Sequence, residues 1–185
     1  MAKHKVILVT DGDRVARSAV EIATANIGGR CISASAGNPT VLDGKEIIEL
    51  VKTAHHDPVV VMVDDRGAKG IGPGELVMER ILKEDNIDVL GVVAVSSNGK
   101  DCRGIKVSCS VTKDGKVIDG GVDKYGNNIG DNNICGDTLS ILPRYKDLVV
   151  VGMGDPGKMD YNDEITKGAP ITTKALQEIL KRNNM

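Results

Sequence analysis

Four aspartates stand in two pairs, and each pair directly follows an apolar stretch of the chain. Asp11 and Asp13 follow the first such stretch, and Asp64 and Asp65 follow a later one. Short, continuous apolar stretches are typical of strands buried on both faces of a parallel sheet. Parallel strands place their carboxyl ends at one edge, so we expect the four carboxylates to converge. Because clustered carboxylates repel one another unless a cation lies between them, the pattern predicts a site for Mg²⁺ or Ca²⁺.

The same four residues have a simpler interpretation, since aspartate is common in helix caps and tight turns. A third interpretation comes from a resemblance to the Asp-x-Asp metal motif of Toprim domains. In those domains the Asp-x-Asp follows a later strand and a glutamate follows the first, whereas here the Asp-x-Asp follows the first. The resemblance therefore extends to the fold level alone. It implies, as an alternative function, a metal-dependent enzyme that handles phosphate.

A glycine-rich loop at residues 67–74 leads from the second aspartate pair into a helix. Lys69 and the backbone amides of Gly70, Gly72 and Gly74 could together bind an anion, with Gly12 contributing from the first turn. The loop does not follow the Walker pattern of phosphate-binding loops. The competing interpretation is that the glycines let the backbone turn sharply into Pro73 at the start of the helix. Both interpretations of the loop stay open.

Apolar periodicity predicts the elements that would position these residues. Strands are expected at residues 6–9, 31–36, 59–63, 88–95 and 147–151. Helices are expected after Asp13 and Asp43, after Pro73, and near the end of the chain after a cap at Thr172. Strands that alternate with helices at this spacing indicate a mainly parallel sheet covered by helices on both faces, a Rossmann-like three-layer α/β sandwich.

Two segments depart from that alternation. Residues 106–112 and 116–119 flank Asp114-Gly115, which predicts a β-hairpin added to the sheet. Residues 152–157 read G-x-G-x-x-G after a strand, but the polar residues that follow lack the apolar stripe of a helix. We expect a loop there rather than a dinucleotide site. Residues 138–142 are expected to form a short helix.

Composition narrows the classes of function. A chain of 185 residues, 41% hydrophobic and 27% charged, suits one α/β domain over residues 1–185. A net charge of −2, with no Phe or Trp and three Tyr, argues against nucleic acid as a partner. The four cysteines lack zinc-site spacing and are expected to be reduced thiols. Without a signal peptide or a long apolar run, we expect a cytoplasmic chain that does not insert into membranes.

Three blocks of residues carry a resemblance to the stage V sporulation protein AE family, in its soluble form. The first block is Val-Thr-Asp-Gly-Asp at residues 9–13. The second is Val-Asp-Asp-Arg-Gly at residues 63–67, running into Gly-Pro-Gly-Glu at 72–75. The third is Gly-Val-Val-Ala-Val-Ser-Ser-Asn at residues 91–98. The resemblance extends over nearly the whole chain.

The resemblance implies a cytosolic accessory of the membrane system that moves dipicolinic acid into the developing spore and out at germination. Its partners would be membrane proteins of that channel, and it would lie in the forespore or spore, next to the inner membrane only through those partners. The family offers no catalytic residues to transfer, so a non-enzymatic role is preferred. Binding of a small anion or of a divalent cation, and self-association, stay open.

Overall fold

The computed structural model describes residues 3–68, 70–97 and 104–185. Its main sheet has seven strands in the order β2-β3-β1-β4-β9-β6-β7, and all neighbours are parallel except β6 and β7. The strands are β1 (His4–Val9), β2 (Arg30–Cys31), β3 (Val59–Met62), β4 (Ile87–Val95), β6 (Cys109–Val111), β7 (Val117–Ile118) and β9 (Val149–Met153). A separate antiparallel pair joins β5 (Ile105–Lys106) to β8 (Asn133–Ile134).

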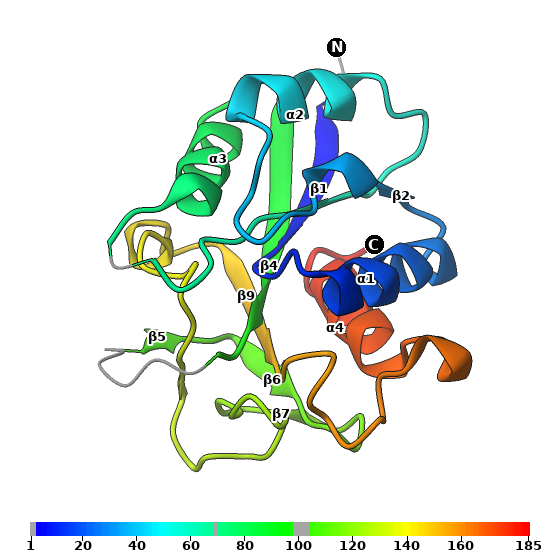
Figure 1. Ribbon diagram of the computed structural model, residues 1–185, viewed down its shortest axis with the longest axis vertical. Coiled ribbons are helices and arrows are strands. Elements are labelled where there is room, and N and C mark those ends of the chain that lie inside the picture. The colour runs from blue at the N-terminus through cyan, green and yellow to red at the C-terminus, as the bar shows by residue number, and fades with distance from the viewer. Residues whose placement is uncertain (1–2, 69, 98–103) are drawn as a thin grey trace.

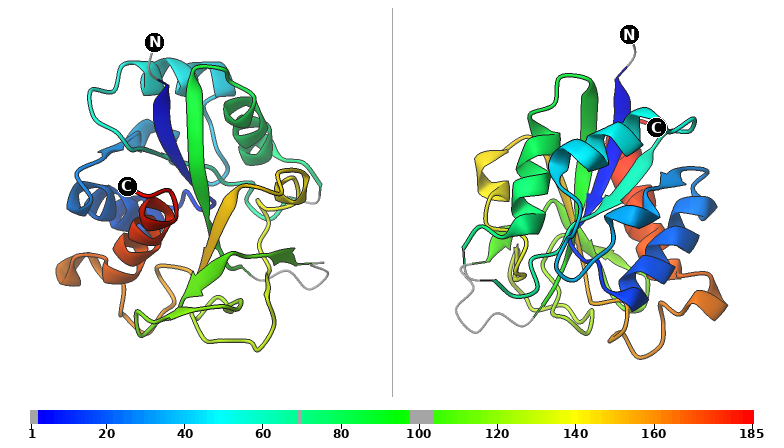
Figure 2. Two further views of the ribbon diagram at one scale, coloured as in Figure 1. Left: turned by 180° about the vertical axis from the view of Figure 1, so that it is seen from behind. Right: turned by 45° about the horizontal axis from the view of Figure 1, so that its top comes forward.

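Helices cover both faces of this sheet. On one face lie α1 (Arg14–Asn26) and α4 (Pro170–Arg182), and on the other lie α2 (Gly44–Lys52) and α3 (Pro73–Leu82). Figures 1 and 2 show the two helix pairs on opposite sides of the strands. The prediction of a three-layer α/β architecture with a mainly parallel sheet is confirmed.

The alternation of side chains along β1 divides the core in two. Val6 and Leu8 pack with the cluster that contains the apolar residues of α2 and α3, whereas Ile7 and Val9 pack with the residues of α1 and α4. All four are fully or almost fully buried. A strand buried on both faces has no polar side, which explains the continuous apolar stretch in its sequence.

Helix α1 buries a narrower stripe than its sequence indicates. Its buried residues are Ala16, Ala19, Val20, Ala23 and Thr24. Val15, which the periodicity places on the inner face, is 51% exposed. It lies in the first turn of the helix, beside Gly157 in the loop that follows β9, rather than over the sheet.

The predicted strand at residues 31–36 is mostly wrong. Only Arg30–Cys31 pairs with β3, and the chain then forms a 3₁₀ turn at Ser33–Ser35. The hydroxyl of Ser35 donates to the Ile32 carbonyl at 2.6 Å and accepts the Met62 amide at 2.8 Å. A serine side chain that bonds nearby backbone in this way competes with continued strand pairing.

Three other predicted elements differ in extent or origin. The segment at 138–142 is not an α-helix, and a 3₁₀ turn is found at Leu142–Arg144; another lies at Ile165–Lys167. The hairpin is confirmed, but its strands are short and β6 joins the main sheet by pairing with β9. Helix α4 begins before Thr172, and its first amides are bonded by Asp163 instead.

Two further expectations concern the cysteines and the membrane. Cys31 and Cys109 are free thiols. Cys135 is disulfide-bonded, so the expectation of four reduced thiols is wrong for this residue. In the part of the chain that the structure describes, none of the helices combines the length and the apolar character needed to span a bilayer.

Candidate functional site

The carboxyl ends of β1 and β3 lie side by side. The two strands are parallel neighbours, with Val9 opposite Met62. After β1 the chain enters α1 on one face of the sheet, and after β3 it leads to α3 on the other. Such a change of direction between adjacent strands is where open α/β sheets place their ligand crevices. We call Asp11, Asp13, Asp64 and Asp65 at this edge the acidic rim.

Asp11 and Asp13 occupy the turn after β1. Asp13 caps α1, because its Oδ1 accepts the amides of Val15 at 2.8 Å and of Ala16 at 2.9 Å. Asp11 accepts a single, longer bond of 3.3 Å from the Asp13 amide. Asp11 is partly exposed and is therefore the rim carboxyl with the least hydrogen bonding and some access to solvent.

Asp64 joins the two turns. Its Oδ2 accepts the amide of Gly12 at 3.2 Å, and its Oδ1 accepts the amide of Arg66 at 2.7 Å. Its own backbone amide donates to the hydroxyl of Thr40 at 2.8 Å. Asp64 is 6% exposed, so this carboxyl group links the turns from inside the protein.

Asp65 binds the beginning of α3. Its Oδ1 accepts the amides of Gly74 at 2.6 Å and of Glu75 at 3.2 Å. The amide of Gly74 is among those expected to bind an external anion, and a carboxyl group of the protein occupies it. The other oxygen, Oδ2, is buried without a hydrogen-bond partner.

The glycines predicted to bind an anion differ from one another in what surrounds them. A Cβ at Gly72 would lie 2.4 Å from Oδ1 of Asp65, so this glycine allows the carboxyl to approach the loop. The amide of Gly12 is bonded to Asp64. Gly70 has a positive φ of 82° and open space around it. Lys69 lies outside the described residues.

Burial raises the pKa of three rim carboxyls. The pKa of Asp11 rises to about 8 because of burial and then because of the nearby carboxylates of Asp13, Asp155 and Asp64. The pKa of Asp65 rises to about 6 through burial, with further contributions from Glu75 and Asp137. Burial also raises the pKa of Asp64.

Sequence reasoning missed three charged residues at this edge. Asp155 follows β9, accepts the Gly157 amide at 2.9 Å and pairs with Lys158 at 2.6 Å. Asp137 accepts a hydrogen bond from the amide of Gly67. Since β9 is parallel to β4, the strand-end rule that selected the rim could also have found Asp155. Asp137 belongs to a loop without periodicity, and no comparable signal marks it.

The rim gives mixed support to a cation site. Among residues 3–68, 70–97 and 104–185, no three His, Cys, Asp or Glu side chains are grouped as a metal ion would require. The unpartnered, buried Oδ2 of Asp65 is the one feature of the rim that favours a cation. The predicted Mg²⁺ or Ca²⁺ site stays a prediction.

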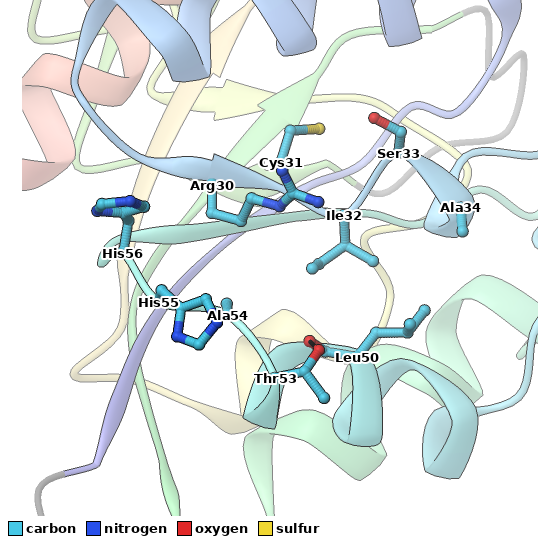
Figure 3. Close-up of a pocket in the computed structure, with 10 residues that line it drawn as sticks. All are labelled: Arg30, Cys31, Ile32, Ser33, Ala34, Leu50, Thr53, Ala54, His55 and His56. Atoms are coloured by element: carbon cyan, nitrogen blue, oxygen red, sulfur yellow. Dashed lines mark hydrogen bonds between the residues drawn. The ribbon is translucent and has the colours of Figure 1, made fainter.

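A second concave feature lies beside the edge strand β2. We call it the basic hollow, and its volume is about 500 Å³. It lies between β2 and the last turn of α2, and Figure 3 shows the side chain of Ile32 facing Leu50 across it. The lining residues used below are Arg30, Ile32, Leu50, Ala54, His55 and His56.

Comparison with known proteins decides the family. The model of the family described as stage V sporulation protein AE1 matches residues 5–183. The chain belongs to this family. Membership implies a role in sporulation. Comparisons with curated proteins and with solved structures gave no match.

In this AE1-family chain, the three blocks that carry the resemblance are hydrogen-bonded to one another. The amide of Gly12 in the first block bonds to Asp64 in the second. The hydroxyl of Thr10 accepts the amide of Val95, which belongs to the third block, at 3.0 Å. The Thr10 amide in turn donates to the carbonyl of Val93. These three segments thus form one continuous edge of the sheet, which includes the acidic rim.

Proposed function

We propose that this AE1-family protein is a cytosolic accessory of the membrane machinery that moves dipicolinic acid into the forespore and releases it at germination. The observation that carries the proposal is the joining of the three family blocks at one edge, through Gly12, Asp64 and Thr10. The edge at the carboxyl ends of parallel strands is where open α/β sheets place their sites. The partners would be membrane proteins of the channel.

The acidic rim is the part of this edge that would act on a partner. Asp64 and Asp65 are 6% and 2% exposed and are bonded to backbone amides, so they shape the edge. Asp11 is partly exposed and has one long hydrogen bond, so its carboxyl group is available to a hydrogen-bonding group of a partner.

Replacement of the gene in a spore-forming host tests the proposal. Strains would carry the wild-type chain, a deletion, Asp11→Asn, or Asp88→Asn as a matched control. Asp88 is an exposed aspartate at the opposite, amino end of β4. We expect the deletion and Asp11→Asn to lower the dipicolinic acid content of spores or slow its release, and Asp88→Asn to behave as wild type. Co-purification of the channel proteins with the tagged chain is expected to follow the same order.

An unchanged content and release in the deletion strain would contradict the transport role. A defect in the deletion strain that Asp11→Asn fully rescues would keep the role and remove the rim from it. Because Asn retains the oxygen that accepts the Asp13 amide, the variant is expected to fold, which thermal unfolding checks.

A metal-dependent phosphate-handling enzyme is the second candidate, favoured by the raised pKa of Asp11 among other carboxylates. Perturbed carboxyl groups gather at functional sites more often than elsewhere. A bound cation would stabilise the folded chain, so this candidate predicts a higher Tm in MgCl₂ or CaCl₂ than in NaCl of equal ionic strength. Asp11→Asn would abolish the difference. Equal Tm values in the three salts would remove this candidate.

A further inference from the structure

We propose that the basic hollow binds a small organic carboxylate, at a site separate from the acidic rim. The ligand would place its carboxylate against Arg30 and His55 and its apolar body between Ile32 and Leu50. The inference does not depend on the role in dipicolinic acid transport, because it rests on the hollow alone.

The charge of the hollow favours an anion. Its lining includes Arg30, His55 and His56 and contains no carboxylate, although the chain as a whole has a net charge of −2. Two of the three histidines of the sequence are therefore gathered here. All three of these side chains belong to exposed residues, so a dissolved ligand can reach them.

The guanidinium of Arg30 has no ion pair with any carboxylate in the described part of the chain. Nearby acidic residues have other partners. Glu49 pairs with Lys52 at 3.2 Å, and Asp57 lies 3.8 Å from His4. A planar guanidinium can donate two parallel hydrogen bonds to a carboxylate, so an unpaired arginine beside a cavity suits that group well.

The apolar half of the lining explains why an organic anion is preferred to an inorganic one. Ile32 is 7% exposed, and Leu50 and Ala54 are partly buried against the same core cluster. Figure 3 shows that Ile32 faces Leu50 of α2 across the hollow, while Arg30 runs along its margin. A volume of about 500 Å³ lies within the range of small-molecule pockets.

A metal ion is a poorer fit. Cys31, the one thiol near the two histidines, points to the other side of β2, as Figure 3 shows. Its neighbours there include Glu21 and Thr24 of α1. In the portion that the structure describes, no His, Cys, Asp and Glu side chains form a metal-holding group of three or more. Because successive residues of an extended chain alternate in direction, Arg30 and Ile32 share one side, and the sulfur of Cys31 points to the other although this residue also belongs to the lining.

Titration of the ¹⁵N-labelled full chain with isophthalate, a flat dicarboxylate, tests the inference. We expect saturable shifts of amide resonances confined to residues 30–34 and 50–56. Arg30→Gln is expected to weaken binding about tenfold or more, the effect of losing charge-assisted hydrogen bonds. Arg80→Gln, at an exposed arginine of α3 away from the hollow, is the matched control and is expected to leave the affinity unchanged.

Three results would overturn the inference: no saturable shifts with isophthalate, equal affinity in wild type and Arg30→Gln, or binding of sulfate as tight as that of isophthalate. A second variant, Ala54→Leu, fills the hollow without changing charge and is expected to weaken binding as well. Pyridine-2,6-dicarboxylate, the acid of the proposed machinery, is titrated in parallel. If isophthalate binds and this acid does not, the carboxylate site stands and the hollow has no part in dipicolinic acid transport.

Discussion

At the scale of single residues, the carboxyl group of Asp11 has a pKa far above its usual value, which favours its protonated form. Burial raises its pKa to about 8, and Asp13, Asp155 and Asp64 add negative charge around it. One amide at 3.3 Å is the hydrogen bond that favours its ionised form. Asp65 lies in an equally acidic region but accepts two amides, and its pKa rises only to about 6. The two backbone amides lower the pKa of Asp65 and so oppose the effect of its burial.

The first prediction concerns the pH dependence of stability. Because the folded pKa of Asp11 lies above the unfolded value of 3.8, the folded state binds a proton that the unfolded state releases. Its contribution to the free energy of unfolding is therefore fully present below about pH 4 and is lost as the pH rises from there to about 8. We expect Asp11→Asn to exceed wild type in stability by roughly 1–3 kcal/mol at about pH 9 and to approach it as the pH falls to about 4.

Urea unfolding of both proteins across this pH range measures the effect, and Asp88→Asn serves as the control. Parallel stability curves for wild type and Asp11→Asn would show that Asp11 ionises at the same pH in the folded and unfolded chains. They would also remove the electrostatic argument for the rim.

At the scale of elements, the helices begin in two different ways. Asp13 and Asp43 cap α1 and α2 from the position directly before each helix, and both caps could be predicted from the sequence. The first amides of α3 and α4 are instead bonded by Asp65 and Asp163, which lie eight residues or more earlier in the chain. No local pattern marks a cap that reaches its helix through a loop, which is why Thr172 was predicted in place of Asp163.

The second prediction compares these two kinds of cap. Asp163 is 2% exposed and accepts the amides of Ile171 and Thr172 at 2.7 and 2.9 Å, together with the Thr172 hydroxyl. Its removal leaves buried donors without partners. We expect Asp163→Ala to lower the free energy of unfolding by about 2–3 kcal/mol and Asp43→Ala, at an exposed cap, by about 1 kcal/mol. Urea unfolding near neutral pH measures both, and an equal loss in the two variants would contradict the comparison.

The third prediction concerns the close contact of α3 with the rim. A Cβ at Gly74 would lie 2.6 Å from the backbone nitrogen of Asp64, which cannot move without disturbing β3. A Cβ at Gly44, in the first turn of α2, would lie 2.7 Å from Cγ and 2.8 Å from Cβ of Arg80, so it would meet a side chain rather than the backbone of a strand end. In an ordinary helix, replacing Gly with Ala stabilises by up to about 1 kcal/mol.

We therefore expect Gly74→Ala to destabilise the chain by about 2 kcal/mol or more, and Gly44→Ala to destabilise it less, because the side chain of Arg80 can shift more easily than the backbone of Asp64. Thermal and urea unfolding compare the two variants. A Gly74→Ala protein as stable as wild type would mean that α3 can move away from the rim, and that the glycine serves the turn alone.

At the scale of the whole molecule, the directions of the strands could be predicted from the sequence, whereas the paths of loops could not. The apolar stretches after which Asp11 and Asp64 stand predicted two parallel strands with a common edge, and that edge is present. Asp155 closely follows β9, so the same strand-end rule applies to it. Asp137 belongs to a loop whose path depends on packing rather than on periodicity. The basic hollow could not be predicted from the sequence either, because the pairing of β2 with β3 brings Arg30 and His55 together.

The last prediction concerns the independence of the rim and the hollow. Arg30 pairs in register with Val59 at the amino end of β3, whereas Asp64 follows its carboxyl end. Five residues of strand separate these levels by about 16 Å. At such a distance, without shared partners, effects of substitutions are additive. We expect Asp11→Asn to leave the affinity for isophthalate unchanged, and Arg30→Gln to leave the pH dependence of unfolding unchanged. The double variant would show both single effects in full. A loss of isophthalate binding in Asp11→Asn comparable to that in Arg30→Gln would instead mean that β3 couples its two ends, and that rim and hollow belong to one site.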